Sequence, residues 1–168
     1  MRRLPIFFLL DVSESMAGDS LRQLQQGLDR LVRSLRTDPH ALETVYLSMI
    51  AFAGKAKTLT PLIEVASFYP PRLPVGSGTA LGVALEHLMV EIDKNVIKTT
   101  PDRKGDWKPV VYLMTDGKPT DNIANALRRW QKYYKNQVSL IAIGVGQYAA
   151  LDTLRQLTDQ VLHLDAQT

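Results

Sequence analysis

Two short apolar runs in the chain each lead into an aspartate. Residues 5–12 read PIFFLLDV and residues 109–117 read PVVYLMTDG, so both runs are continuous rather than alternating. Continuous apolar runs of this length are typical of strands buried on both faces of a parallel sheet. We therefore expect Asp11 and Asp116 to lie at the carboxyl ends of two central strands.

Stretches with apolar residues at helical spacing follow these strands. In the first stretch, leucine and valine recur at this spacing as far as Leu35, and Ser20 and Gln23 form a predicted capping box at its start. This helix is expected to end near Thr37. Further helices are predicted over residues 79–95, 121–135 and 149–157.

Four more β-rich runs complete the expected sheet, over residues 44–53, 57–65, 138–146 and 160–164. Gly54 and Lys55 separate the first two runs and predict an antiparallel hairpin at one sheet edge. Elsewhere strands alternate with helices. This order predicts an α/β fold: a doubly wound, Rossmann-like, mostly parallel six-stranded sheet with one antiparallel edge strand and helices on both faces. In such folds ligands bind at the carboxyl ends of the strands, where the strand order reverses.

Length and composition are those of a single globular domain, which we expect over residues 1–168. Hydrophobic residues make up 45% of the chain and charged residues 22%, so a real core is expected. There is no cysteine, and a bound metal would therefore need oxygen or imidazole ligands. The net charge of +3 comes from scattered Lys and Arg and does not indicate nucleic-acid binding.

The amino terminus resembles a signal peptide, because Arg2 and Arg3 precede an apolar run. Pro5 and Asp11 limit that run, and a buried first strand explains it better. No apolar run approaches the roughly 20 residues of a membrane span. We therefore expect a soluble, cytoplasmic protein with no membrane association.

Five polar residues converge in the expected topology: Asp11, Ser13 and Ser15 after the first strand, Thr79 at a helix start, and Asp116 after the fourth strand. They offer two carboxylates and three hydroxyls, and a hard cation such as Mg²⁺ takes about six oxygen ligands. We predict a metal site in which the hydroxyls are neutral ligands and the aspartates act directly or through water. Mn²⁺ and Ca²⁺ are the alternative cations.

Many neutral ligands would leave the cation with much of its positive charge. A remaining coordination position would then attract an anionic oxygen from outside, and a Glu or Asp side chain of a partner protein is the natural candidate. The predicted function is a protein-binding module rather than an enzyme.

The sequence resembles von Willebrand factor A domains. D-x-S-x-S at Asp11, Ser13 and Ser15, the G-[ST]-G-T segment ending at Thr79, and T-D-G at Asp116 look like the metal-ion-dependent adhesion site of that family. The resemblance covers essentially the whole chain. It implies that the two serines ligate directly, that Thr79 does so in a high-affinity state, and that the two aspartates act mainly through water.

Within that family, the T-D-G-x-P-T-D run at residues 115–121 is similar to the TerY-type proteins of bacterial tellurium-resistance and stress clusters. Such proteins are thought to be intracellular scaffolds, some beside a kinase and a PP2C-type phosphatase. The resemblance implies those enzymes as partners. The cysteine-rich extension that such proteins often carry is missing here, which leaves a shorter member or a truncated chain as alternatives.

Other interpretations compete with a protein-binding metal site. Gly144, Gly146 and Ala149, with Asp165, imitate a dinucleotide fingerprint, but they fall in the last βαβ unit, so we interpret the glycines as turn residues. A Mg-dependent phosphotransferase or phosphatase would use an aspartate at a strand end, yet Ser13 stands where such a site needs its second aspartate. A metal that only stabilises the fold is a third possibility.

Polar residues around the predicted site have simpler expected roles. Glu14 should be a rim residue that faces solvent or a partner. Lys118 is either a plain surface lysine or a rim cation that attracts an acidic partner and slightly weakens metal binding. Asp121 is predicted to cap its own helix, with Thr120 as the competing cap.

Overall fold

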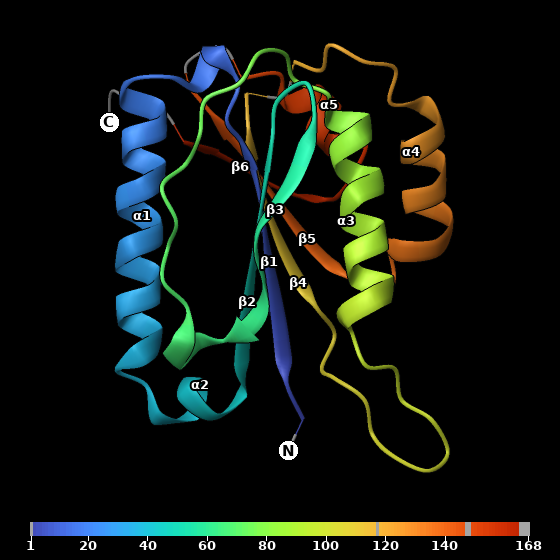
Figure 1. Cartoon of the computed structure of the whole chain (residues 1–168). Helices are drawn as coiled ribbons and strands as arrows, with labels where there is room; N and C mark the ends of the chain where they lie inside the picture. The colour runs from blue at the N-terminus through green and yellow to red at the C-terminus, as the bar shows by residue number, and fades with distance from the viewer. Residues whose placement is uncertain (1, 117, 147–148, 165–168) are drawn as a thin grey trace.

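The computed structural model describes residues 2–116, 118–146 and 149–164. Their strands form one six-stranded sheet (Figure 1). Gly117 of the T-D-G motif and Asp165 of the dinucleotide-like pattern lie outside the described residues. The strands are β1 Leu4–Asp11, β2 Val45–Phe52, β3 Ala56–Glu64, β4 Val110–Thr115, β5 Ser139–Val145 and β6 Gln160–Leu164.

The strand order is β3-β2-β1-β4-β5-β6, and all neighbours are parallel except β2 and β3. From β1 the chain moves through β2 to the edge at β3, then crosses back to β4 and continues the other way. The order therefore reverses between β1 and β4, which end at Asp11 and just before Asp116. The predicted fold class is confirmed, including the antiparallel edge strand.

Helices cover both faces of the sheet (Figure 1). Alternate residues of β1 feed the two cores, because Phe8 and Leu10 pack with α1 while Phe7 and Leu9 pack with α3. None of the helices in the described ranges is long and apolar enough to cross a membrane. One face carries α1 Asp19–Arg36 and α2 Pro39–Thr44; the other carries α3 Leu81–Asn95, α4 Ala124–Arg129 and α5 Leu151–Arg155. Short turns lie at η1 Glu14–Met16, η2 Val65–Ser67 and the π-helical η3 Trp130–Tyr134.

The start of α1 differs from the prediction. The helix begins at Asp19, and its N-cap is Gly18 with φ of 86°. Only glycine adopts this left-handed backbone without strain, so the turn after η1 is fixed by Gly18. The predicted capping box at Ser20 and Gln23 is therefore wrong, because the chain is already helical at these residues.

The helix predicted over residues 121–135 begins later, at Ala124, and ends in the π-helical turn η3. Asp121 does not cap it. Its two carboxylate oxygens accept hydrogen bonds from the backbone N–H groups of Gly82 at 3.2 Å and Val83 at 3.1 Å, in the first turn of α3. Those N–H groups have no partner inside their own helix, so a carboxylate from another segment satisfies them.

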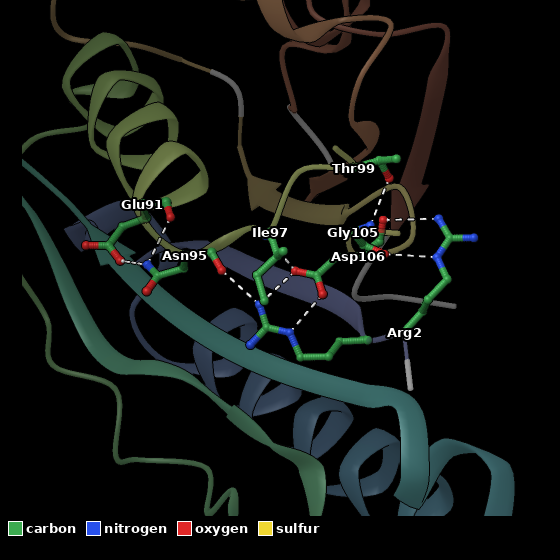
Figure 2. Close-up of polar contacts among 8 residues, drawn as sticks. Arg2, Glu91, Asn95, Ile97, Thr99, Gly105 and Asp106 are labelled. Atoms are coloured by element: carbon green, nitrogen blue, oxygen red, sulfur yellow. Dashed lines mark hydrogen bonds and ion pairs between the residues drawn. The ribbon is translucent and has the colours of Figure 1, made fainter. Parts of the chain in front are cut away.

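A partly buried ion pair fixes the end of the sheet opposite to the predicted site. The Arg3 guanidinium donates to both oxygens of Asp106 at 2.8 and 2.7 Å, and the Ile97 N–H donates to the same carboxylate at 2.8 Å. Figure 2 shows this cluster, with Arg2 reaching the Gly105 carbonyl. Burial alone would raise the pKa of Asp106, but these hydrogen bonds outweigh it and lower the pKa. The loop before β4 is thereby tied to the start of β1.

Candidate metal centre

Asp11 ends β1 as a fully buried carboxylate. Its Oδ1 accepts a hydrogen bond from the Ser13 N–H at 2.8 Å, and its Oδ2 accepts one from the Thr115 hydroxyl at 2.7 Å. Thr115 is the last residue of β4, so the second bond joins the two strand ends where the order reverses. Asp11 therefore orients the loop after β1 and ties it to β4.

Ser13, Ser15 and Asp116 form a continuous chain of polar side chains across the same point. The hydroxyl oxygens of the two serines lie 2.9 Å apart, and the Ser15 hydroxyl donates to Oδ2 of Asp116. The tight turn η1 produces this spacing, and Met16, which is 1% exposed, anchors the turn in the core. Oxygens from segments about 100 residues apart thus meet at one place.

Thr79 enters this region from a third segment, as a buried residue two positions before α3. Its N–H donates to the Thr120 hydroxyl at 2.9 Å, and its carbonyl accepts from the Thr120 N–H at 2.8 Å. Thr120 follows Asp116 closely along the chain, so these bonds hold the two segments together. Among the described residues, no hydrogen bond joins the Thr79 hydroxyl to the other four predicted ligands.

The sequence does not predict the role of Thr120. Its expected role is a competing cap for the helix that follows it, and the structure shows Thr120 bonded to Thr79 instead. No local pattern identifies such a contact, because the two residues are 41 positions apart.

Charge and donor chemistry at this site suit a hard cation. Burial raises the pKa of Asp11; hydrogen bonds from Ser13 and Thr115 oppose the rise, and the nearby Asp116 carboxylate adds to it. A cation beside these oxygens would favour the ionised carboxylate. Within the described ranges there is no group of three or more His, Cys, Asp or Glu that could hold a metal, so a site here would need the hydroxyl oxygens as well.

The loop before α3 forms one wall of the site. The Gly76 N–H donates to the Val12 carbonyl at 2.9 Å, and Gly76 pairs with Ser13 as an isolated β-bridge. Next to it, the Ser77 hydroxyl donates to a carboxylate oxygen of Glu14 at 2.6 Å. Glu14 is exposed, as expected for a rim residue.

The glycines of the dinucleotide-like pattern have structural roles. Gly146 has φ of 94°, and a Cβ at Gly144 would lie 2.5 Å from Cδ2 of Leu151 and 3.1 Å from Cβ of Ala149. A turn that needs a left-handed residue and a close strand-to-helix contact account for both glycines. The turn interpretation therefore holds for Gly146, whereas it is wrong for Gly144, which lies inside β5 and is required for the close contact with Leu151.

The fold and the polar strand ends define a class of protein: a doubly wound α/β domain with a hydroxyl-rich candidate site at the point where the strand order reverses. A family model described as von Willebrand factor type A domain matches residues 6–162. The chain belongs to this family.

Curated relatives are similar to this chain in sequence. Matrilin-1 from Bos taurus is 24% identical over 161 residues, a match that covers 92% of this chain and 28% of matrilin-1. The chain spans about a third of the length of the curated relatives it matches, at 28%, 35% and 31% for the first three.

Solved structures show the same fold. The von Willebrand factor type A structure from Catenulispora acidiphila has a TM-score of 0.74 at 19% identity, covering 99% of this chain and 40% of that chain. Proximal thread matrix protein 1 from the mussel byssus, in a structure with a zinc-occupied metal-ion-dependent adhesion site motif, has a TM-score of 0.69 at 23% identity, covering 98% of this chain and 44% of that chain.

Proposed function

We propose that this chain is a metal-dependent protein-binding module. Ser13, Ser15 and Asp116 would hold a divalent cation with Asp11 and Thr79, directly or through water, and the cation would capture a Glu or Asp carboxylate of a partner protein. The observation that carries this proposal is the unbroken series of oxygens from Ser13 through Ser15 to Asp116. Mg²⁺ is the proposed cation, with Mn²⁺ and Ca²⁺ as alternatives.

Contacts of the two aspartates favour binding over catalysis. Asp11 is fully buried, and both of its carboxylate oxygens accept hydrogen bonds from the protein. A carboxylate nucleophile must reach the substrate atom that it attacks, and this one is enclosed. Asp116 accepts from the Ser15 hydroxyl and from the Lys118 N–H at 3.1 Å. The phosphotransferase or phosphatase alternative therefore gains no support from these contacts, and we propose no catalytic step.

A hydroxyl-rich donor set supports capture of an external carboxylate. Three of the five proposed ligands are neutral, so the cation would keep positive charge for an additional anionic ligand. The mussel byssus protein carries zinc at its own metal-ion-dependent adhesion site motif. That observation supports a divalent cation in this family without identifying the cation of this chain.

We further propose a cytoplasmic scaffold of the TerY type, acting in a bacterial tellurium-resistance or stress response. The T-D-G-x-P-T-D run at residues 115–121 supports this assignment. A kinase and a PP2C-type phosphatase are the proposed partners. Affinity capture from the native cell extract, with Mg²⁺ or with EDTA and with Asp11→Ala as control, should recover these enzymes only from the wild type with Mg²⁺. Recovery of the same enzymes in EDTA would refute this assignment.

Metal binding is tested most directly at Ser15, which is exposed and can be shortened without opening the core. Isothermal titration with MgCl₂ and MnCl₂ should show that Ser15→Ala weakens binding by roughly tenfold or more, since one ligand is lost. Ser34→Ala is the matched control, because Ser34 is an exposed serine on α1. Circular dichroism should show that both variants fold. Equal metal affinity for Ser15→Ala and the wild type would contradict the proposed site.

A purely structural metal would leave a different signature. A ligand at a hundred times its Kd stabilises the fold by about 2.7 kcal/mol whatever its role, so a thermal shift alone does not distinguish the two functions. Partner capture does. If Mg²⁺ raises the melting temperature while partners still bind in EDTA, the metal serves the fold and the adhesion role is wrong.

A further inference from the structure

A groove of about 410 Å³ lies beside the candidate metal centre, between the β2–β3 hairpin and the loop before α3. We call it the hairpin groove. Its apolar lining includes Val12, Ala51, Leu59, Pro74 and Val75. Val75 is 55% exposed, so an apolar wall faces solvent at the groove mouth.

The hairpin groove is continuous with the candidate metal centre. Gly76 lines the groove and pairs with Ser13, a proposed ligand, while Val12, which stands between Asp11 and Ser13 in the chain, also lines the groove. Ser77, also in the lining, bonds to Glu14. A chain segment that places a carboxylate on the metal would therefore have its neighbouring residues over this groove.

Backbone contacts hold the groove in shape before any ligand binds. The Ala80 N–H donates to the Ala53 carbonyl at 2.7 Å, which fixes the hairpin turn to the start of α3. At Gly54 a Cβ would lie 2.7 Å from the Ser77 carbonyl oxygen, so the hairpin and the loop are in close contact. A preformed groove gives tighter binding, because less order must be imposed when the ligand enters.

Charge at the groove selects an acidic occupant. Lys55 and Lys57 line it and are exposed, and none of the described residues in its lining is acidic. The cation at the adjacent centre would add positive charge on the same side. Like-charged segments would be repelled, and acidic segments attracted, before contact is made.

We infer that the hairpin groove binds an apolar side chain of the partner, from an acidic segment in which that side chain neighbours the metal-binding carboxylate. This inference rests on the proposed function and adds the partner's chemistry to it. The cation would supply the anchor for the carboxylate, and the groove would supply selection for the residue beside it. Burial of a leucine side chain corresponds to roughly tenfold or more in affinity.

Two synthetic tripeptides test the inference: acetyl-Leu-Glu-Leu-amide and acetyl-Gly-Glu-Gly-amide, titrated into ¹⁵N-labelled protein with Mg²⁺ and followed by NMR. The leucine peptide should bind roughly tenfold more tightly and shift the amide signals of Val75, Gly76 and Ala53. Equal affinities, no detectable binding of the leucine peptide, or leucine-dependent shifts outside the groove would overturn the inference.

Variants locate the effect. Val75→Asp should remove the preference for leucine, whereas Val90→Asp should keep it, because Val90 is a 59% exposed valine on α3. The double variant Lys55→Glu/Lys57→Glu should weaken the binding of both peptides. The control Lys94→Glu/Lys135→Glu makes the same charge change at exposed positions outside the groove lining, so it should have little effect on binding. A preference that survives Val75→Asp would also overturn the inference.

Failure of the proposed function would look different. In that case binding of both peptides would be independent of Mg²⁺ and unchanged in Asp11→Ala, whatever the residues beside the glutamate contribute. If the groove inference alone fails, both peptides still require Mg²⁺ and Asp11 but bind with equal affinity.

Discussion

The contact between Asp121 and the first turn of α3 allows a quantitative test of how the segments around the candidate metal centre are held together. Asp121→Ala leaves the N–H groups of Gly82 and Val83 without their acceptor. The N-cap of α3, Ala80, has no side chain that could replace it. Loss of a capping side chain costs about 1 kcal/mol, and loss of a negative charge at a helix start adds about 0.3–1 kcal/mol. We expect the free energy of unfolding to fall by about 1.5 kcal/mol in total.

Urea unfolding measures that loss, and amide hydrogen exchange shows where it arises. In Asp121→Ala, exchange at Gly82 and Val83 should accelerate, because the first turn of α3 loses its cap. Asn122→Ala is the matched control: the Asn122 side chain accepts from the Ala124 N–H at 2.9 Å, so this variant should affect α4 instead. Faster exchange at Ala124 in Asp121→Ala, with exchange at Gly82 and Val83 unchanged, would refute the reasoning. It would favour the interpretation of Asp121 as a cap of α4.

Three further predictions concern the rest of the fold. Asp106→Asn should lower the free energy of unfolding by about 3 kcal/mol in urea, because it leaves the mostly buried Arg3 charge without its carboxylate. Folding lowers the pKa of Asp106, so the stability from this carboxylate is present above the unfolded pKa and is lost as pH falls through the folded pKa. The melting temperatures of the wild type and Asp106→Asn should therefore converge in acid. A difference in melting temperature that stays constant with pH would contradict this. Gly105→Ala should destabilise the fold by about 2 kcal/mol, because a Cβ would overlap the backbone of residues 97–99. In Gly27→Ala, on α1, the added Cβ meets nothing within 4 Å, so this variant should stabilise the fold by about 0.5–1 kcal/mol. Equal urea midpoints for the two variants would refute the packing argument.

Much of this architecture was predictable because it depends on short-range patterns. Burial on both faces requires continuous apolar runs, and these runs located β1 and β4 to within a residue or two. The alternation of strands and helices then predicted the sheet type, and the strand ends placed Asp11 and Asp116 side by side. The turn at Gly54 and Lys55 likewise predicted the antiparallel edge. Ligand roles for these aspartates and for Ser13 stay a prediction.

One error in the prediction arose from a local turn, and the other from a contact between two elements. The sequence predicts Ser20 and Asp121 as caps of the helices beside them in the chain, since a capping side chain is usually local. In the structure, Gly18, with its positive φ, precedes α1. The Asp121 carboxylate accepts a hydrogen bond from the N–H group of Val83 in α3, 38 residues earlier in the chain.

The sequence by itself determined the order of elements, the burial of the central strands on both faces and the residues at the strand ends, because these follow from patterns over a few positions. Only the tertiary structure decided which polar groups meet: Ser15 with Asp116, Thr79 with Thr120, and Arg3 with Asp106. Each pair is between 41 and 103 residues apart in the chain. Contacts at such separations leave no periodic trace, because they depend on how whole elements pack.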